Sequence, residues 1–473
     1  MSNSNIGLIG LAVMGANLAR NIANHGTKVF VFNRSRNRTD EFIKGFGNEM
    51  LEASYSLEEL VGRLESPRKI ILMVKSGDPV DEIINQLIPL LSEGDIVIDC
   101  GNSFYKDTKR RFEKLLEYKL HFIGCGVSGG EEGALNGPSL MPGGNKEVWE
   151  NNLKSIFEPI AARDFNNGSC VSYIGNHGAG HYVKMVHNGI EYGIMQIMAE
   201  LYAILKNHFK FSAGEISEIF QRLSEGKLKS YLFEIAVDVL AQKDDLTGGY
   251  LIDSILDKAG SKGTGMWTSV DALERGMPLP SITLAVFARY ISSLKTERES
   301  ISKEYGEETF KSQTPNFQNT ESELEDAIYL AVLSVYSQGL ELINQASKEE
   351  NWNINFSELV RIWQGGCIIR AELLGVLQSE FAKSSGYKHM LRFEFIKLGS
   401  VENIGKLRHL CSLAIKAGVS IPSIYSSLEY IESMKSERLS ANFIQGLRDY
   451  FGAHTYERID KEGSFHTKWN NKF

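Results

Sequence analysis

The sequence predicts an α/β N-terminal domain with a doubly wound parallel sheet, followed by a large all-α domain and a C-terminal tail. Three observations predict this organisation. Over roughly the first 175 residues, short apolar runs alternate with amphipathic stretches. From about residue 177 the apolar residues recur at helical spacing, and the last 35 or so residues are rich in aromatic residues and glycine with little helical period. We therefore expect domains at residues 1–177 and 178–436, and a tail at residues 437–473.

The N-terminal part contains the pattern of a sheet that is covered on both faces. Continuous apolar runs, which are typical of buried strands, occupy residues 6–9, 29–32, 70–74, 96–98 and 121–123. Helix-like segments such as residues 15–24, 79–91 and 107–117 separate them. Buried strands that alternate with helices predict a parallel sheet.

The second part begins with one long predicted helix. Its apolar residues follow one another at spacings of three and four, which indicates a helix over residues 181–207: Val183, Val186, Ile190, Ile194, Ile197, Leu201 and Leu205. The helical period continues through residues 212–436, with breaks near Gly248, Gly263, Pro278 and Gly418.

Composition excludes several classes of protein. The 473 residues are 42% hydrophobic and 23% charged, as in ordinary globular proteins. Because 59 acidic residues outnumber 51 basic ones, for a net charge of -8, we expect no sequence-independent binding to nucleic acid or to an anionic membrane. The sequence contains no run of 18 or more apolar residues, so it predicts no membrane span. Five scattered cysteines without a CxxC pair predict reduced thiols in a cytoplasmic protein: Cys100, Cys125, Cys170, Cys367 and Cys411.

A glycine-rich turn after the first strand predicts a dinucleotide site. The pattern GxAxxG follows a predicted strand and opens a helix, as in Rossmann-type domains, and comprises Gly10, Leu11, Ala12, Val13, Met14 and Gly15. Gly10 makes the tight turn, Ala12 lets backbone amides approach a pyrophosphate, and Gly15 lets the helix pack on the strand.

The end of the second strand indicates which dinucleotide is bound. NAD enzymes place an acid there, whereas this chain has Asn33, Arg34 and Ser35. A guanidinium and a hydroxyl would bind a 2′-phosphate that an acid would repel. We interpret this as NADP binding; the alternative is a solvated basic loop.

Four polar residues of the long helix indicate a catalytic face. Lys184, His187, Asn188 and Glu191 lie at i, i+3, i+4 and i+7, so they share one side of the helix. Spacing alone also fits a hydrophilic outer face. Against that alternative, the face mixes four residue types instead of repeating Lys and Glu.

Other clusters would suit an anionic substrate, although each residue alone also reads as a surface residue. Ser128, Gly129 and Gly130 follow a strand and would offer backbone amides to a carboxylate. Lys262 lies between glycines, and its ammonium group would suit a loop that binds phosphate. Further cations are Arg289, Arg448 and His454. The pair His177 and His181 has no carboxylate partner in sequence, so no metal is expected.

Taken together, these motifs resemble the decarboxylating 6-phosphogluconate dehydrogenase family of the β-hydroxyacid dehydrogenase superfamily. The resemblance runs in order from residue 6 to about residue 470. Besides the motifs above, it rests on residues 74–77, 101–102, 126–130, 137–144, 184–192, 262–265 and 451–456.

The resemblance implies a homodimeric enzyme of the pentose phosphate pathway. It would convert 6-phospho-D-gluconate and NADP to D-ribulose 5-phosphate, CO2 and NADPH without a metal. Lys184 would be the base at the C3 hydroxyl, and Glu191 would protonate C1 of the enediol. Substrate contacts would come from Asn102, Ser128, Gly129, Gly130, His187, Asn188, Tyr192, Lys262, Arg289, Arg448 and His454. The family's tail enters the neighbouring subunit, so Arg448 and His454 would act in trans. Cofactor contacts would come from residues 10–15 and from Asn33, Arg34, Ser35, Val74, Lys75, Ser76 and Asn102.

The chain departs from the family pattern outside the matched catalytic positions. Met266 stands where the pattern has Lys, Ile194 where it has Asp, and Gly446 and Leu447 where it has Ala and Gln. Two alternatives remain: a related β-hydroxyacid dehydrogenase for another phosphorylated sugar acid, and an NADP-binding pseudoenzyme with a scaffolding role.

Overall fold

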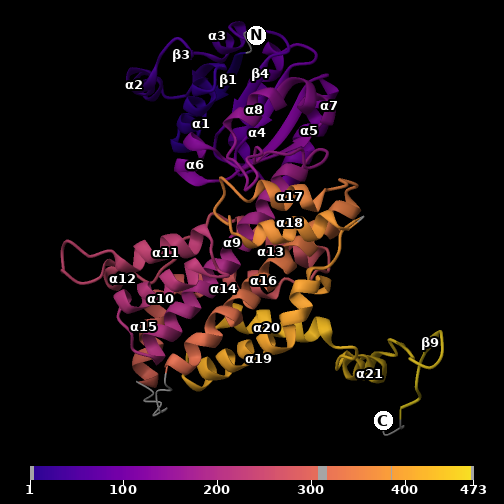
Figure 1. The fold of residues 1–473 in the computed structure, drawn as a ribbon. Helices are drawn as coiled ribbons and strands as arrows, with labels where there is room; N and C mark the ends of the chain where they lie inside the picture. The colour runs from indigo at the N-terminus through magenta and orange to yellow at the C-terminus, as the bar shows by residue number, and fades with distance from the viewer. Residues whose placement is uncertain (1–4, 307–316, 385, 470–473) are drawn as a thin grey trace. The chain divides into compact units, whose positions relative to one another are not determined.

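The computed structural model describes residues 5–306, 317–384 and 386–469. The chain divides into two compact units, Met1–Ser427 (unit 1) and Leu428–Phe473 (unit 2). Within unit 1, the strands gather in the indigo and purple N-terminal part, and the helices that follow α9 form the rest (Figure 1). None of the helices within the described ranges has the length and apolar character that crossing a membrane requires.

A seven-stranded sheet organises the N-terminal part. Its order is β3-β2-β1-β4-β5-β6-β7, and the neighbouring strands from β3 to β6 run parallel. The strands are β1 Asn5–Ile9, β2 Lys28–Phe32, β3 Leu51–Ala53, β4 Lys69–Leu72, β5 Ile96–Asp99, β6 His121–Val127 and β7 Leu140–Gly144. The five predicted strands and the parallel sheet are confirmed.

Strand β7 was not predicted, and it runs antiparallel to β6. Its sequence contains Pro142, Gly143 and Gly144, which argue against a central strand. The strand lies at the edge of the sheet, where a proline is tolerated because it leaves no neighbouring strand without a donor.

Helices cover both faces of the sheet. They are α1 Val13–Asn24, α2 Arg36–Phe46, α3 Leu57–Gly62, α4 Asp78–Leu87 with the 3-10 turn Ile88–Leu90, α5 Tyr105–Glu117, α6 Gly130–Asn136, α7 Lys146–Val148, the π-helical turn Trp149–Leu153, and α8 Lys154–Ile160. On one face Ile71 packs with Leu18 of α1 and Phe157 of α8. On the other face Ile70 packs with Ile84 of α4 and Leu115 of α5. Alternate strand residues thus enter two separate cores.

The long helix α9, Ala179–Ala203, leads from the sheet into the helical part and continues as a π-helical turn, Ile204–His208. This confirms the predicted helix. It packs against α13, α14 and α16. The other helices are α10 Ala213–Glu225, α11 Tyr231–Ala241, α12 Leu251–Ser254, α13 Thr264–Glu274, α14 Pro280–Ser293, α15 Lys295–Tyr305, α16 Phe317–Glu349, α17 Phe356–Ile362, α18 Leu373–Ala382, the 3-10 turn Met390–Arg392, α19 Glu394–Lys416 and α20 Pro422–Lys435.

Unit 2 contains the helix α21, Ala441–Gly452, and a small hairpin of β8, Tyr456–Glu457, with β9, Ser464–Phe465. The helix corrects the expectation of a tail with little helical period. Its apolar residues do recur at helical spacing, but they face outward, and Gly446 and Gly452 obscured the pattern. The exposed apolar residues of α21 are Phe443, Ile444, Leu447, Tyr450 and Phe451.

Candidate active site

The first turns of α9 lie directly on the carboxyl-terminal half of β6. A Cβ atom on Gly180 would collide with the backbone oxygens of Met141 and Gly124, and one on Gly126 would lie 2.5 Å from Cβ of Lys184. Only glycine permits such close approach of a helix to a sheet. Lys184 therefore lies beside the strand end from which the loop of Ser128 begins.

Lys184 is buried, with 7% of its surface exposed, and is held by polar groups. Its Nζ donates to Oδ1 of Asn188 over 2.8 Å and to Oγ of Ser128 over 3.2 Å. The ring of His187 lies between the same partners, with Nε2 3.3 Å from Oγ of Ser128 and Nδ1 3.2 Å from Oδ1 of Asn188. The polar face of α9 is thus a buried cluster and not a hydrophilic outer face.

Burial shifts the titrating groups of this cluster toward their neutral forms. It lowers the pKa of Lys184, although the charge of Glu191 acts in the opposite direction. It also raises the pKa of Glu191, against the lowering influence of Lys184, Arg289 and Lys262. The pKa of His187 lies well below its usual range, first because of burial and then because of Lys184. This site can hold a neutral amine and a protonated carboxylic acid on one helix.

The loop of Ser128, Gly129 and Gly130 is supported from the helical part of unit 1. Gly129 and Gly130 have φ of 106° and 63°, which suits glycine. A Cβ on Gly129 would come within 2.7 Å of the Gly366 oxygen, and the ring of Trp363 lies 5.6 Å from that of His187. Sequence reasoning missed Trp363 and Gly366, because nothing in their local pattern points to residues so much earlier in the chain as His187 and Gly129.

The next turn of α9 brings cationic groups together. The guanidinium of Arg289 from α14 lies over the Tyr192 ring, 3.4 Å from its centre, and donates to the Gly260 oxygen over 3.1 Å. The Tyr192 hydroxyl donates to Oγ of Ser261, 3.3 Å away. The adjacent Lys262 is exposed. This arrangement can receive an anion such as a phosphate group.

The dinucleotide fingerprint has the expected local structure. Gly10 has φ of 106°, and a Cβ there would collide with the Met73 oxygen. The amide of Leu11 donates to Oδ1 of Asn33 over 3.1 Å, which joins the glycine turn to the end of β2. Arg34 and Ser35 are exposed, and Ser35 precedes α2 without capping it through its side chain. An exposed guanidinium and hydroxyl with no acid at the end of β2 fit a dinucleotide with a 2′-phosphate.

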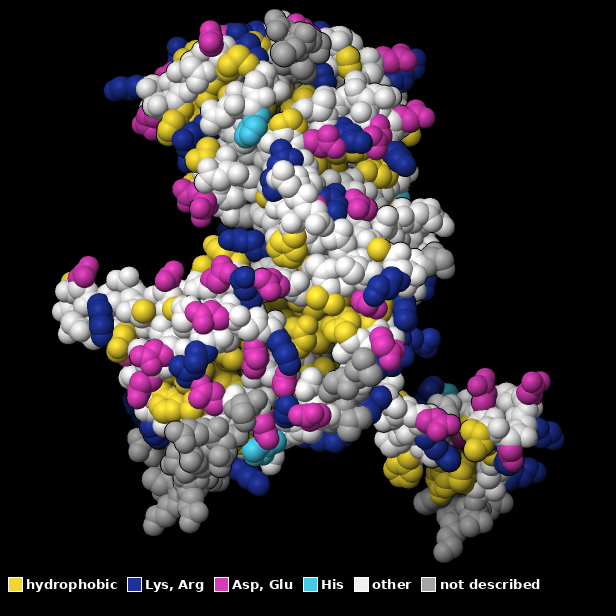
Figure 2. All heavy atoms as spheres, viewed as in Figure 1, with side chains coloured by type: hydrophobic (Ala, Val, Ile, Leu, Met, Phe, Trp, Pro, Cys, Tyr) yellow, Lys and Arg dark blue, Asp and Glu magenta, His cyan; other side chains and the backbone are white. Residues whose placement is uncertain are grey.

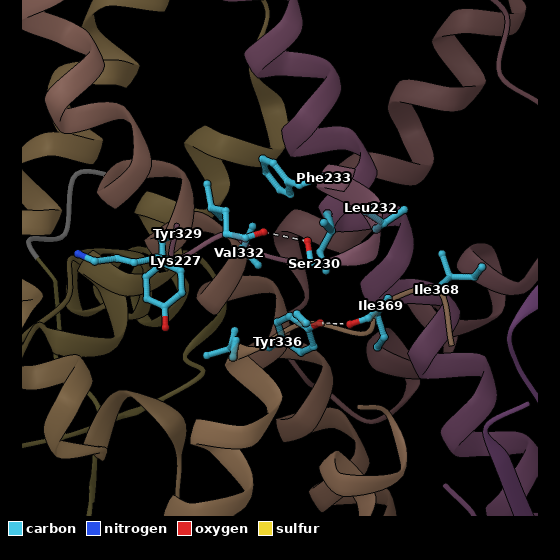
Figure 3. A pocket seen from close by; sticks show the side chains of 13 residues that line it. Lys227, Ser230, Leu232, Phe233, Tyr329, Val332, Tyr336, Ile368 and Ile369 are labelled. Atoms are coloured by element: carbon cyan, nitrogen blue, oxygen red, sulfur yellow. Dashed lines mark hydrogen bonds between the residues drawn. The ribbon is translucent and has the colours of Figure 1, made fainter. Parts of the chain in front are cut away.

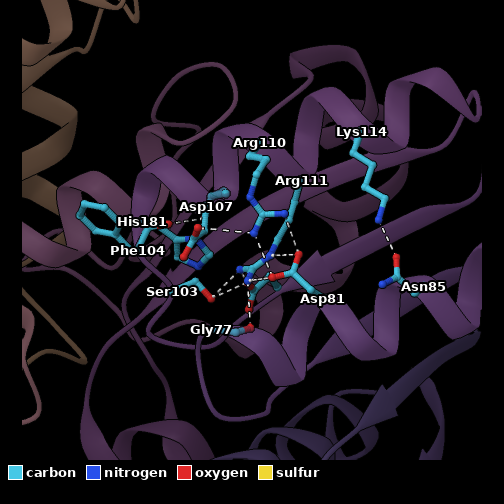
Figure 4. A network of polar contacts seen from close by, with 12 residues as sticks. Gly77, Asp81, Asn85, Ser103, Phe104, Asp107, Arg110, Arg111, Lys114 and His181 are labelled. Carbon is cyan, nitrogen blue, oxygen red and sulfur yellow. Dashed lines mark hydrogen bonds and ion pairs between the residues drawn. The ribbon is translucent and has the colours of Figure 1, made fainter.

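A buried arginine joins the two loops that follow β4 and β5. Arg111 of α5 is fully buried; it donates to the Gly77 oxygen over 3.0 Å and to Asp81 over 2.7 Å. It also lies 3.5 Å from Oγ of Ser103, which donates to Asp99 over 2.6 Å (Figure 4). The loops of Val74, Lys75 and Ser76 and of Asn102 are thereby fixed relative to each other. The sequence offered no signal for Arg111, which reads as one of many helix surface cations.

Ile194, which stands where the family pattern has Asp, lies in apolar surroundings. Its side chain is 4% exposed and lines an apolar hollow formed with α11, α16 and the segment of Ile368 and Ile369. Figure 3 shows this hollow, in which Tyr336 donates to the Ile369 oxygen over 2.7 Å. Met266 is instead 40% exposed.

Arg448 and His454 belong to unit 2. Arg448 of α21 donates to Oε1 of Gln445 over 3.1 Å, and Gln445 donates to the Thr455 oxygen over 2.6 Å. The carboxylate of Asp449 accepts from the amides of Thr455 and Thr467 and from the rings of His466 and Trp469. These contacts give the segment around Arg448 and His454 a defined internal structure.

A glycine turn after the first strand of a parallel sheet defines, together with a helix face that carries a buried lysine and asparagine and a partly buried glutamate, a nicotinamide-dependent dehydrogenase. Two family models match the chain: the NAD binding domain of 6-phosphogluconate dehydrogenase over residues 5–175, and the 6-phosphogluconate dehydrogenase C-terminal domain over residues 180–469. The chain belongs to the 6-phosphogluconate dehydrogenase family.

Individual relatives agree over nearly the full chain. The NADP(+)-dependent, decarboxylating 6-phosphogluconate dehydrogenase of Bacillus subtilis (strain 168) is 49% identical over 469 residues, which cover 99% of this chain and 100% of that protein. The decarboxylating enzyme of Escherichia coli is 46% identical over 99% of this chain and 100% of its own length. The structure of Plasmodium falciparum 6-phosphogluconate dehydrogenase, studied without ligand and with NADP+ or 6-phosphogluconate, has a TM-score of 0.95 at 42% identity, covering 98% of this chain and 100% of that one.

Proposed function

We propose that this chain is an NADP-dependent oxidoreductase that converts 6-phospho-D-gluconate to D-ribulose 5-phosphate and CO2. The observation that carries the proposal is the pair of Lys184 and Glu191 on one face of α9, with burial shifting the pKa of each toward its neutral form. Membership of the family and the relatives' printed activities support the choice of substrate and cofactor.

Lys184 acts as the base at C3. As a neutral amine it takes the proton of the C3 hydroxyl, while Asn188 and Ser128 hold its Nζ in place. NADP, when bound, supplies the acceptor for the hydride that leaves C3. The C3 ketone then accepts the electron pair of the bond between C2 and the carboxylate, which departs as CO2, and protonated Lys184 returns its proton to the C3 oxygen to give the enediol.

Glu191 acts as the acid at C1. It gives its proton to C1 of the enediol that decarboxylation leaves, while neutral Lys184 takes up the proton of the enediol hydroxyl, which yields the ketose product. In water a neutral lysine with a protonated glutamate lies about 6 pK units, or roughly 8 kcal/mol, above the ion pair. Burial of both side chains reduces this difference, because it disfavours both charges.

Substrate and cofactor are held by groups around this pair. The carboxylate and hydroxyls are bound by Asn102, Ser128, Gly129, Gly130, His187 and Asn188, and the phosphate by Tyr192, Lys262, Arg289, Arg448 and His454. The dinucleotide is bound by residues 10–15 and by Asn33, Arg34, Ser35, Val74, Lys75, Ser76 and Asn102. The contacts of Tyr192 with Arg289, and of Leu11 with Asn33, support this division.

The enzyme is a homodimer in which Arg448 and His454 act in trans. Exposed apolar residues support an interface between copies: Met266, Val270 and Leu273 on α13, Phe287, Tyr290 and Ile291 on α14, Leu294 directly after α14, and the outward face of α21. Figure 2 shows apolar side chains exposed among charged ones over the helices of unit 1.

Domain boundaries after residues 177 and 436, and a cytoplasmic location, complete the proposal. The two family models meet between residues 175 and 180, which supports the first boundary. All five cysteines are buried and none of them forms a disulfide, which supports a reducing compartment.

NADPH formation from 6-phosphogluconate tests the function, with NAD and unphosphorylated gluconate as controls. We expect a rate with NADP far above that with NAD, and little activity on gluconate. Lys184→Ala abolishes hydride transfer in a single turnover, and Glu191→Gln lowers turnover by about 100-fold or more. A folded wild-type protein that binds NADP but forms no NADPH would instead support the pseudoenzyme or another sugar acid.

Mixing two inactive variants tests the action in trans. A heterodimer of Lys184→Ala and Arg448→Ala chains contains one intact site if the tail crosses to the partner, and none if it does not. Random mixing then restores about a quarter of wild-type activity, because half of the dimers are mixed. No recovery in a verified heterodimer contradicts the trans arrangement.

A further inference from the structure

Asp271 of α13 lies in a buried polar cluster outside the groups proposed to touch substrate. The side chain is 2% exposed. Its Oδ1 accepts from the Tyr105 hydroxyl over 2.6 Å, and its Oδ2 accepts from the Tyr182 hydroxyl, also over 2.6 Å. One carboxylate thus joins α13 to α5 and α9.

A cation compensates the charge of this buried carboxylate. Nε of Arg275 donates to Oδ2 of Asp271 over 2.9 Å, and Nη2 of Arg275 donates to the Tyr105 hydroxyl over 3.0 Å. Arg275 also pairs with Glu349 at the end of α16. Burial and the Asp271 charge raise the pKa of both tyrosines, so both remain hydroxyl donors at neutral pH. Both tyrosine hydroxyls and all three guanidinium nitrogens therefore have an acceptor.

Each helix in the cluster carries one part of the active site. Tyr182 lies two residues before Lys184, and Tyr105 lies three residues after Asn102. The helix of Asp271 begins at Thr264, directly after the loop of Lys262. A shift of α13 would therefore move the phosphate-binding loop relative to the base and to the loop of Asn102.

A second hydrogen bond also holds α13 against the helix of Lys184. Oγ1 of Thr268 in α13 donates to the Met185 oxygen over 2.9 Å, next to Lys184. This contact joins α13 only to α9. The carboxylate of Asp271 hydrogen-bonds to both α9 and α5, and α5 belongs to the sheet-bearing part that carries the dinucleotide fingerprint.

We propose that Asp271 is a positioning residue of the active site, whose carboxylate sets the spacing between the Lys184 base, the Asn102 loop and the Lys262 loop. The inference rests on the proposed function, because it assigns these three segments to one substrate. Asp271 acts through Tyr105, Tyr182 and its own helix, and it touches no reacting atom.

Asp271→Asn tests this role with little change in size. An amide has one acceptor oxygen where the carboxylate has two, and its NH2 group would face a hydroxyl or guanidinium donor. The matched control is Asp95→Asn. Asp95 is 1% exposed and accepts from Arg68 over 2.9 Å and from the Ser92 amide over 2.9 Å, at the amino-terminal end of β5, away from the site.

Three readouts separate positioning from mere stability. For Asp271→Asn we expect a KM for 6-phosphogluconate raised at least fivefold, calorimetric binding of 6-phosphogluconate without NADP weakened to a similar degree, and a larger isotope effect with C3-deuterated substrate. Asp95→Asn lowers the melting temperature but leaves all three at wild-type values. If Asp271→Asn does not fold, Tyr182→Phe and Tyr105→Phe, which each remove one hydroxyl, are expected to show the same changes at smaller size.

Failure of this inference can be distinguished from failure of the proposed function. The inference alone is overturned if the wild type is active and the Asp271→Asn protein, or both tyrosine variants, keep the wild-type KM, affinity and isotope effect. A wild type that forms no NADPH from 6-phosphogluconate overturns the proposed function, and the inference with it.

Discussion

Nζ of Lys184 donates to Oδ1 of Asn188 over 2.8 Å, one helical turn further along α9. A neutral amide at this position holds the amine in place without adding a negative charge that would favour the ammonium form. Together with burial, which lowers the pKa of Lys184, this favours the neutral amine.

Asn188→Asp is expected to move the acidic limb of the kcat–pH profile to higher pH by about 1 to 3 units, because a carboxylate beside Nζ raises the pKa of Lys184. Steady-state rates across the pH range measure the shift. Asn188→Ala is the control: it removes the hydrogen bond without adding charge, so activity falls with no such shift. An unmoved limb in the Asp variant would exclude Lys184 as the titrating base.

Arg34→Glu is expected to raise the KM for NADP by at least tenfold while leaving the KM for NAD within a factor of about three. The exposed Arg34 at the end of β2 is placed to meet the 2′-phosphate, which a carboxylate would repel. Initial rates with both dinucleotides measure the ratio. Lys44→Glu, an exposed charge reversal at the far end of α2, leaves it unchanged. Equal losses with NADP and NAD would contradict the assignment.

Glu200 is expected to make unfolding depend on pH. Burial raises its pKa from the ordinary 4.5 to about 7, although the amides of Ile424 and Ser423 lower it. Between these values the folded state keeps a proton that the unfolded chain has lost, so stability falls as pH rises. The loss from pH 4.5 to above pH 7 is about 3 kcal/mol. Denaturant unfolding at pH 4.5 and pH 8 measures this fall in the free energy of unfolding. We expect it to be absent in Glu200→Gln and unchanged in the exposed control Glu117→Gln. Identical pH dependence in Glu200→Gln and wild type would refute the assignment.

Asp449→Asn is expected to raise the KM for 6-phosphogluconate more than it lowers kcat. Its carboxylate accepts four hydrogen bonds, one from the amide of Thr455 next to His454 and three from residues 466–469 after β9. Although burial opposes it, the hydrogen bonds from His466, Thr467 and Trp469 lower the pKa of Asp449 to about 2. The carboxylate form, and the order it gives, therefore persist until pH falls toward that value. Asp460→Asn, which removes an exposed ion pair with Arg458, leaves KM unchanged. A wild-type KM in Asp449→Asn would show that this network does not serve the substrate.

The features that could be predicted from the sequence are those that depend on residues close together in the chain. Continuous apolar runs identified five strands, and regular spacing identified α9 with its four polar residues on one face. Strand β7 was missed because Pro142 and two glycines resemble a loop, and α21 because its apolar residues are exposed and Gly446 and Gly452 obscure their helical spacing.

Contacts between distant segments could not be predicted in this way. Asp271 and Tyr105 are separated by 166 residues, and only the folded chain brings them within hydrogen-bonding distance. Arg111 has the same sequence character as its exposed neighbour Arg110, yet it is fully buried. The residues that we propose to bind ligands belong to sequence motifs, whereas the residues that we propose to position them are brought together by packing.

The continuity of α9 fixes the separation of the proposed base and acid. Lys184 and Glu191 are seven residues apart on one uninterrupted helix, which corresponds to a rise of about 10 Å and nearly two full turns. No hinge between the sheet and the helical part can change this separation, since both residues belong to the same rigid element. A single residue inserted between them would rotate Glu191 by about 100° about the helix axis and remove it from the face of Lys184.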